Sequence, residues 1–410
     1  MEEKTKTLVS LSIAQLLATL IWYNYSAVLP ILKTEWNLTG TMAGAILASF
    51  QAGYVISVLA TGYLTDRVGG AKTFAICACE TGLCGLAFAF LAKDFFSALV
   101  LRGLAGIGQG GLYVPGMKIL SSCYPPKERG MALGVYTCSL VGAYAGAYYI
   151  AGPIAVAQGW RIGIFWTSIW AFPAALIAYF SAKGMSVSPA KGQALDFRTF
   201  KKGVLENRAA ALVTIAYLGH MWELYAMWGW IGPYIDSCAR VLGYSRRDAL
   251  FIGTTVAATM ILMGGFSPAI GGLLSDKLGR PKSIVLIMLS SIPCSLVYGW
   301  LIGMPLWILV TIGLFYGFVV VADSAIYKAA LTELVPGEML GSALGLQSFL
   351  GFGATILSTA AFGVVLDLTN APLEVSTLGY FPRWGWAFAM LGTIALVGPF
   401  SALLLMRLKR

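Results

Sequence analysis

Residues 62–72 read Gly-Tyr-Leu-Thr-Asp-Arg-Val-Gly-Gly-Ala-Lys and lie between two long apolar segments. The chain repeats this charged stretch at residues 272–282, which read Gly-Leu-Leu-Ser-Asp-Lys-Leu-Gly-Arg-Pro-Lys. At a shift of 210 the identical positions are Gly62, Leu64, Asp66, Gly69 and Lys72. A charged hairpin that recurs at about half the chain length indicates a duplicated architecture. The sequence therefore predicts two similar halves.

The amino-acid composition excludes a water-soluble globular protein. Of the 410 residues, 58% are hydrophobic and 11% are charged, which is far from the balance of soluble domains. Twelve apolar segments each reach the roughly 20 residues that a helix needs to cross a bilayer. They lie at about residues 7–31, 40–63, 73–92, 95–120, 131–156, 160–182, 209–235, 249–273, 283–303, 305–331, 341–366 and 384–406. We expect an all-α membrane protein with twelve transmembrane helices.

Further matches extend the repeat beyond the hairpins. Trp22 pairs with Trp222 at a shift of 200, and Lys118 pairs with Lys328 at a shift of 210. A polar and basic stretch separates the two series of apolar segments. The predicted domains are a first six-helix bundle, a cytoplasmic linker and a second six-helix bundle, at residues 1–182, 183–208 and 209–410.

The formal net charge of +10 indicates orientation in the membrane and no nucleic-acid partner. With the N-terminus in the cytoplasm, most of the 28 Lys and Arg residues fall in cytoplasmic segments, as the positive-inside tendency requires. We expect a monomer in the plasma (inner) membrane with both termini cytoplasmic. Because most of the seven cysteines lie in apolar segments, we expect neither disulfides nor a metal site. We also expect no cofactor.

Several motifs together resemble those of the major facilitator superfamily of secondary transporters. They are the two charged hairpins, Arg102 followed by spaced glycines, Pro-Pro-Lys-Glu-Arg-Gly at residues 125–130, and Trp160 followed by Arg161. The resemblance spans nearly the whole chain. It implies two pseudo-twofold-related six-helix bundles, a substrate cavity between them near the middle of the bilayer, and alternating access by rocking of the bundles.

Ionisable residues inside apolar segments are the first functional candidates, because a charge in hydrocarbon costs a few kcal/mol or more. The guanidinium of Arg102 either holds a substrate oxyanion or serves as a structural or proton-relay partner of a buried acid. Asp323 corresponds to Tyr113 in the repeat and is expected to face the cavity, where it either pairs with Lys328 or belongs to a gate. The substrate-binding candidates are Arg102, Tyr25, Asn24, Gln51, Gln109, Tyr113, Tyr225 and Asp323.

His220 and Glu223 are the candidates for coupling transport to protons. They are three residues apart, so a helix places them on one face. Burial disfavours the charged form of both groups. We expect Glu223 to take up the coupling proton with help from His220; the alternative is a local structural hydrogen-bonded pair.

The other intramembrane polar and aromatic residues have simpler explanations. Lys118 and Lys328 occupy matching places near the inner ends of their segments, where they either extend toward the interface or contact substrate. Trp228 and Trp230 are expected to belong to the aromatic belt at the membrane surface.

Charged residues of the inner loops are the candidates for a gate. The family resemblance implies that oppositely charged groups there hold the inner side closed while the cavity opens outward. Surface ion pairs are individually modest, so several can break during transport. A role in topology alone is compatible with the same residues. The gating candidates are Asp66, Arg67, Glu128, Arg129, Asp276 and Arg280.

The predicted function is proton- or ion-coupled secondary transport of a small polar solute, with an organic anion such as a carboxylate preferred. One alternative is a proton-coupled exporter of a cationic or zwitterionic drug or metabolite. However, Val156 and Ala157 stand where the antiporters of the family carry glycines. Another is a membrane receptor that binds a solute without moving it. The sequence has no nucleophile–base pair or phosphate loop, so we do not expect an enzyme.

Overall fold

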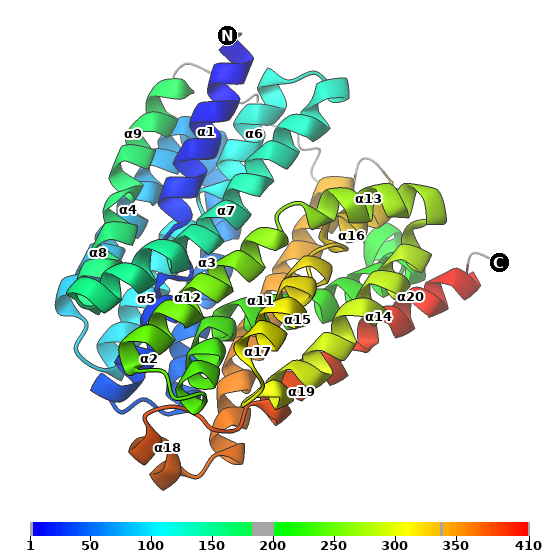
Figure 1. Ribbon diagram of the computed structural model, residues 1–410. Coiled ribbons are helices and arrows are strands. Elements are labelled where there is room, and N and C mark those ends of the chain that lie inside the picture. Colours follow the sequence, from blue (N-terminus) through cyan, green and yellow to red (C-terminus); the bar gives the residue numbers. More distant parts are fainter. Residues whose placement is uncertain (1–2, 183–200, 337–338, 409–410) are drawn as a thin grey trace.

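The computed structural model describes residues 3–182, 201–336 and 339–408, and the regular elements in them are helices (Figure 1). The predicted linker at residues 183–208 lies largely outside the described part of the chain. We call the described residues before the linker the first half and those after it the second half.

The first half is built from long helices and from helix pairs that share one axis. Its helices are α1 (Glu3–Thr19), α2 (Asn24–Glu35), α3 (Gly40–Val68), α4 (Gly70–Leu91), α5 (Phe95–Gln109), α6 (Tyr113–Cys123), α7 (Pro126–Gln158), α8 (Trp160–Ile169) and α9 (Ala171–Ser181). The pairs α1 and α2, α5 and α6, and α8 and α9 each correspond to one predicted apolar segment. The half therefore holds six helical stretches that are long and apolar enough to cross a membrane.

The second half repeats this plan after a short π-helix. Its elements are η1 (Lys201–Leu205), α11 (Arg208–Val241), α12 (Arg246–Met263), α13 (Ser267–Leu278), α14 (Arg280–Tyr298), η2 (Gly299–Leu301), α15 (Leu306–Val319), α16 (Ser324–Thr332), α17 (Leu340–Thr369), α18 (Pro372–Leu378), α19 (Gly385–Ala395) and α20 (Val397–Leu408). We call the face where α1 begins and α20 ends the terminal face. The opposite face carries the short helix α18.

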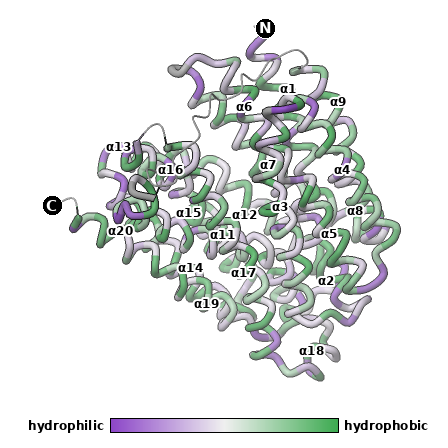
Figure 2. The backbone as a smooth tube through the Cα atoms, turned by 180° about the vertical axis from the view of Figure 1, so that it is seen from behind, coloured by the Kyte–Doolittle hydropathy of each residue, from purple (hydrophilic) through white to green (hydrophobic). Residues whose placement is uncertain are grey.

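Eleven helical stretches within the described residues are long and apolar enough to cross a membrane. The remaining predicted segment is α11, whose 34 residues include the polar groups of His220, Glu223 and Asp236. Most of α11 is buried among the other helices, so polar groups on it do not meet lipid. Figure 2 places the hydrophilic segments mainly at the helix ends and hydrophobic residues along the helices between them. These observations confirm the all-α membrane fold.

The repeated hairpins have the same backbone conformation. α3 ends at Gly69, whose φ and ψ are 90° and 150°, and α13 ends at Gly279, whose φ and ψ are 85° and 150°. Residues with a side chain rarely adopt a positive φ, so glycine is required at both turns. The next helix begins directly afterwards in each half.

Two crossings are interrupted at matching positions of the repeat. α5 ends at Gln109 and α6 begins at Tyr113, while α15 ends at Val319 and α16 begins at Ser324. The predicted shift of 210 relates the two breaks to within one residue. A third break separates α1 from α2. Broken helices at membrane depth are tolerated where protein groups satisfy the freed backbone atoms, and such breaks often form transporter sites.

The two halves are in close contact at the opposite face. α3 packs against α17, and α7 packs against α12. A Cβ added at Gly40 would lie 2.4 Å from the carbonyl oxygen of Gly363, and one at Gly152 would lie 2.2 Å from Thr254 Oγ1. The backbone amides of Gly40 and Thr41 donate to the carboxylate of Asp367 over 2.6 and 2.7 Å. A residue of the second half thus caps a helix of the first.

At the terminal face the two halves stand apart. Figure 1 shows the ends of α6 and α7 separated from those of α13 and α16. Glycines on the terminal parts of α7 and α17, Gly134 and Gly345, would have no atom within 4 Å of an added Cβ. Thr137 and Phe349, one turn further along, are exposed. The structure is therefore closed at the opposite face and open at the terminal face.

Asp367→Asn is expected to increase opening of the opposite face about fivefold. The substitution weakens a charged cap at a helix N-terminus, an interaction worth about 1 kcal/mol. Cys238 reports opening, because it lies near this end of α11 and is 0% exposed. Maleimide labelling of Cys238 in purified protein without other cysteines measures the change.

The matched control for this experiment is Glu374→Gln. Glu374 lies at the same face but pairs with Arg383 of its own half over 2.7 Å, so its loss should leave the labelling rate unchanged. Equal labelling of the wild type and the Asp367 variant would show that the cap does not hold this face closed.

Candidate functional site

The break between α1 and α2 is held by Arg102, which projects from α5. Its Nη1 donates to the carbonyl oxygen of Ile21 over 2.8 Å, and its Nη2 donates to that of Trp22 over 2.7 Å. The guanidinium carbon lies 4.2 Å from the centre of the Phe50 ring. Arg102 is 3% exposed. The side chain thus supplies the donors that the interrupted helix lacks.

Two other predicted ligands are also buried in the first half, Asn24 in the network of Arg102 and Gln109 in a separate one. Arg102 Nη1 also donates to Asn24 Oδ1 over 3.2 Å, and Asn24 donates to Thr167 over 2.9 Å. Gln109 donates to Thr19 over 2.8 Å. In this conformation Arg102, Asn24 and Gln109 stabilise the interior of the first half, and the guanidinium does not present its paired donors to a ligand.

The acids of the second half form two adjacent networks. His220 Nδ1 lies 2.8 Å from Asp323 Oδ1, and His220 Nε2 lies 3.0 Å from Ser324 Oγ. Asp323 also accepts from the hydroxyl of Tyr327. The predicted alternative in which Asp323 pairs with Lys328 is therefore wrong. The α15–α16 break places the Asp323 carboxylate against α11.

Glu223 has neutral partners. Its carboxylate accepts from Ser295 Oγ over 2.6 Å and from Ser291 Oγ over 3.0 Å, both on α14. Glu223 is 1% exposed, and Asp323 lies within electrostatic range of it. His220 and Glu223 therefore bind different helices, and the predicted alternative of a local hydrogen-bonded pair between them is wrong. A buried carboxylate with hydroxyl partners alone is expensive to keep charged.

An aromatic cluster from both halves fills the middle of the protein. The ring of Phe352 lies 4.7 Å from that of Tyr54, 5.4 Å from that of Tyr225 and 6.4 Å from that of Trp22. Trp228 joins the cluster, with its ring 5.4 Å from that of Tyr144. Apart from the contact between Phe352 and Tyr225, these contacts cross between the halves.

This packing shows where several residues singled out from the sequence lie. Trp228 and Trp230 are 2% and 0% exposed, so the prediction that they belong to the membrane-surface belt is wrong; helix α11 lies between the halves, away from lipid. Gln51 accepts from Thr359 over 3.1 Å across the boundary of the halves. Tyr25 faces the interior of the first half, where its ring lies 6.2 Å from that of Phe88.

A lysine is exposed on the terminal side of the aromatic cluster. Lys328 lies on α16, within an apolar segment predicted to cross the membrane, and its side chain is exposed. Its ammonium group is within electrostatic range of the phenols of Tyr113, from the first half, and Tyr217, from the second. Tyr113 is half-buried, and its hydroxyl lies 2.8 Å from Thr137 Oγ1. Lys328 therefore faces the space between the halves on the open side.

The predicted gate residues form contacts within each half. Arg67 lies over the ring of Tyr63 at 4.5 Å, and Glu128 binds Lys4 over 2.7 Å. Arg129 is half-buried, and its Nε has no hydrogen-bond partner among the residues that the structure describes. The side chain of Asp66 lies outside the described residues.

In the second half, Arg280 binds Asp276 over 2.6 Å and Glu333 over 2.9 Å. These bonds also stay within one half. The gating role assigned to the charged loops concerns a closed terminal face, and it stays a prediction.

Sequence reasoning missed several central residues. The rings of Tyr54, Tyr144 and Phe352 were not selected, because their importance depends on the pairing of α3, α7 and α17. Gln347 is 1% exposed, and neither atom of its amide has a hydrogen-bond partner among the described residues. Buried polar groups are normally satisfied, so Gln347 is a candidate ligand-binding group. The signal was available, since Gln347 is the single amide side chain in α17.

Comparisons with known proteins agree on one family. The family model described as Major Facilitator Superfamily matches residues 11–359. A hexuronate transporter of Bacillus subtilis (strain 168) is 26% identical over 367 residues, which cover 83% of each chain. A cis,cis-muconate transport protein of Acinetobacter baylyi is 25% identical over 391 residues, covering 88% of this chain and 87% of that one. A bacterial Spinster homologue, solved in an inward-facing and unoccupied conformation, superposes with a TM-score of 0.81 at 15% identity, over 99% and 98% of the chains.

Proposed function

The chain belongs to the major facilitator superfamily, and on this premise we propose that it is a proton-coupled secondary transporter of an organic anion that carries a carboxylate. The family makes it an integral membrane protein that moves a small molecule. Hexuronates and muconate are both carboxylates, so the relatives named for them favour this substrate class. The observation that carries the proposal is the exposed Lys328, which faces the space between the halves on the open side, in a half that also buries the acids Glu223 and Asp323.

Lys328 is the proposed anion-binding group. Its ammonium lies where the halves separate, with the phenols of Tyr113 and Tyr217 within electrostatic range. A hydrogen bond between a charged donor and a carboxylate is short and about twice as strong as a neutral one. We assign Arg102, the anion-binding residue expected from the sequence, a supporting role in this conformation, because its Nη1 and Nη2 bind the first half.

Glu223 is the proposed proton carrier. A carboxylic acid donates to a hydroxyl oxygen, and a carboxylate accepts from one, so Ser291 and Ser295 can partner either form. Proton uptake by Glu223 would accompany the entry of an anion and keep the loaded protein close to electroneutral. The His220–Asp323 pair lies within electrostatic range of Glu223. A change in the charge of Glu223 would therefore change the electrostatic energy of this pair.

The proposed orientation places the terminal face in the cytoplasm, in the plasma (inner) membrane, with the chain acting as a monomer. The open side described here then faces inward. The charged loops that contain Asp276 and Glu128 would close this side in the alternate state, while the contacts of Asp367 at the opposite face would break.

Counterflow in proteoliposomes tests the transport proposal. Liposomes containing the purified protein are loaded with unlabelled D-glucuronate or cis,cis-muconate and diluted into the labelled anion. We expect transient internal accumulation several-fold above that of protein-free liposomes. A receptor that only binds its ligand gives no such overshoot, and accumulation of organic cations in parallel assays would contradict the anion assignment.

A further inference from the structure

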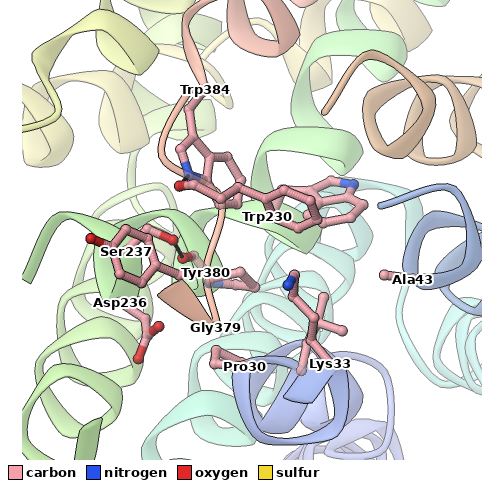
Figure 3. Close-up of a pocket in the computed structure, with 12 residues that line it drawn as sticks. Pro30, Lys33, Ala43, Trp230, Asp236, Ser237, Gly379, Tyr380 and Trp384 are labelled. Atoms are coloured by element: carbon pink, nitrogen blue, oxygen red, sulfur yellow. Dashed lines mark hydrogen bonds between the residues drawn. The ribbon is translucent and has the colours of Figure 1, made fainter. Parts of the chain in front are cut away.

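A small cavity lies at the opposite face, outside the central site. Its volume is about 10 Å³, about one water molecule. Figure 3 shows Lys33 extending from α2 toward Trp230, with Tyr380 and Trp384 on the other side. The lining comes from both halves, because Lys33 belongs to the first and Trp230 to the second. The cavity must therefore widen when the halves separate at this face.

Lys33 is buried in this wall without an anionic partner. It is 8% exposed, and within the described part of the chain its ammonium group makes neither a hydrogen bond nor an ion pair. Its Nζ lies 4.6 Å from the centre of the Phe381 ring. A buried ammonium normally pairs with an acid, and a cation–π contact alone is a partial substitute.

The neighbouring acids are already engaged. Asp367 lies within electrostatic range of Lys33, but its two oxygens accept from the backbone amides at the start of α3. Asp236 is 2.9 Å from Arg240, whose positive charge adds to that of Lys33. Neither acid therefore forms an ion pair with the ammonium of Lys33, and the nearby guanidinium of Arg240 opposes its positive charge.

We propose that Lys33 forms a second anion-binding site, which receives the carboxylate of the substrate when the opposite face opens. This inference rests on the proposed transport of organic anions. The ammonium of Lys33 binds the carboxylate group, and the rings of Trp230 and Trp384 contact the body of the molecule. In the closed structure the cavity is too small for such a ligand. The site thus captures or releases substrate at this face, before or after it occupies the site at Lys328.

Protection of Cys238 from a maleimide reagent tests the proposal. Cys238 lies on α11 two residues beyond Asp236, which lines the cavity. Labelling is measured in the wild type and in Asp367→Asn, both without other cysteines, at increasing concentrations of D-glucuronate and cis,cis-muconate. We expect both anions to slow labelling, while D-glucose, which lacks the carboxylate, has no effect.

Variants at Lys33 test the site directly. Lys33→Gln is expected to raise the half-protecting anion concentration about tenfold or more, as loss of a charged hydrogen bond predicts. Lys33→Arg should stay within about threefold of the parent. Lys93→Gln, which removes an exposed lysine at the same face, should leave protection unchanged.

Three results would overturn the proposal. The first is equal protection in the parent and Lys33→Gln. The second is a changed labelling rate in Lys33→Gln without anion but an unchanged half-protecting concentration, which indicates a purely structural lysine. The third is absence of protection in every protein. Failure of counterflow with protection intact would instead reject transport and keep the binding site.

Discussion

Lys328→Gln is expected to lower kcat/KM for carboxylate transport by about 10- to 100-fold. The substitution removes the exposed ammonium at the boundary of the halves, and a charged hydrogen bond is worth about 1.5–3 kcal/mol. The glutamine side chain still donates a neutral hydrogen bond, so residual transport at high substrate concentration is expected. Initial rates of labelled anion uptake into proteoliposomes, measured over a range of concentrations, give the change.

Two further variants define what this result means. Lys328→Arg keeps the positive charge, so transport should stay within about tenfold of the wild type. It should not be fully retained, because a guanidinium differs in geometry from an ammonium. Lys93→Gln removes the same charge from an exposed position at the opposite face and should have no effect. If Lys328→Gln transports anions as the wild type does, the anion site lies elsewhere, and the unpartnered amide of Gln347 becomes the first position to test.

The repeat made much of the fold predictable. Local rules fix the turns at Gly69 and Gly279, since a positive φ needs glycine wherever the chain folds in this way. The same shift relates the breaks before Tyr113 and Ser324, and an apolar segment of sufficient length specifies a crossing almost by itself. These features depend on sequence spacing and require no knowledge of how the helices rotate against one another.

The site was less predictable because its contacts depend on that rotation. Arg102 was identified as a costly buried charge, yet its partners are carbonyl oxygens that become available only because α1 stops at Thr19. His220 and Glu223 share a face of α11 in sequence, but each binds a different neighbouring helix. Trp228 was assigned to the membrane surface from its position along the helix, whereas the contact between halves buries it.

The closed opposite face depends on a similar long-range pairing. Asp367 and Gly40 are more than three hundred positions apart, and neither is unusual within its own segment. The close approach of Gly40 to Gly363 brings the carboxylate to the first turn of α3. From the sequence alone, an acid at the end of an apolar helix would be predicted to be solvated. Only the packing of α3 on α17 converts it into a cap that joins the halves.

Glu223→Gln is expected to abolish proton-driven accumulation of the anion while counterflow persists. Glutamine keeps the shape and can hydrogen bond to Ser291 and Ser295, but it cannot bind and release a proton. With one proton per monoanion, wild-type liposomes should accumulate substrate up to about tenfold per unit of pH difference, acidic outside, since one pH unit corresponds to about 1.4 kcal/mol. The Glu223 variant should reach an accumulation ratio of about one.

The direction of the pH response and a control variant at a second carboxyl group complete this test. In the wild type, acidifying the outside should raise accumulation, because protonation of the carrier on that side favours loaded inward movement; in Glu223→Gln the ratio should not respond to pH. Glu80, a half-buried acid on α4 that accepts from Cys84 over 3.3 Å, is the matched control, and Glu80→Gln should accumulate the anion as the wild type does. Accumulation by Glu223→Gln that still follows the pH gradient would move the coupling to Asp323 and His220, which form a buried pair 2.8 Å apart.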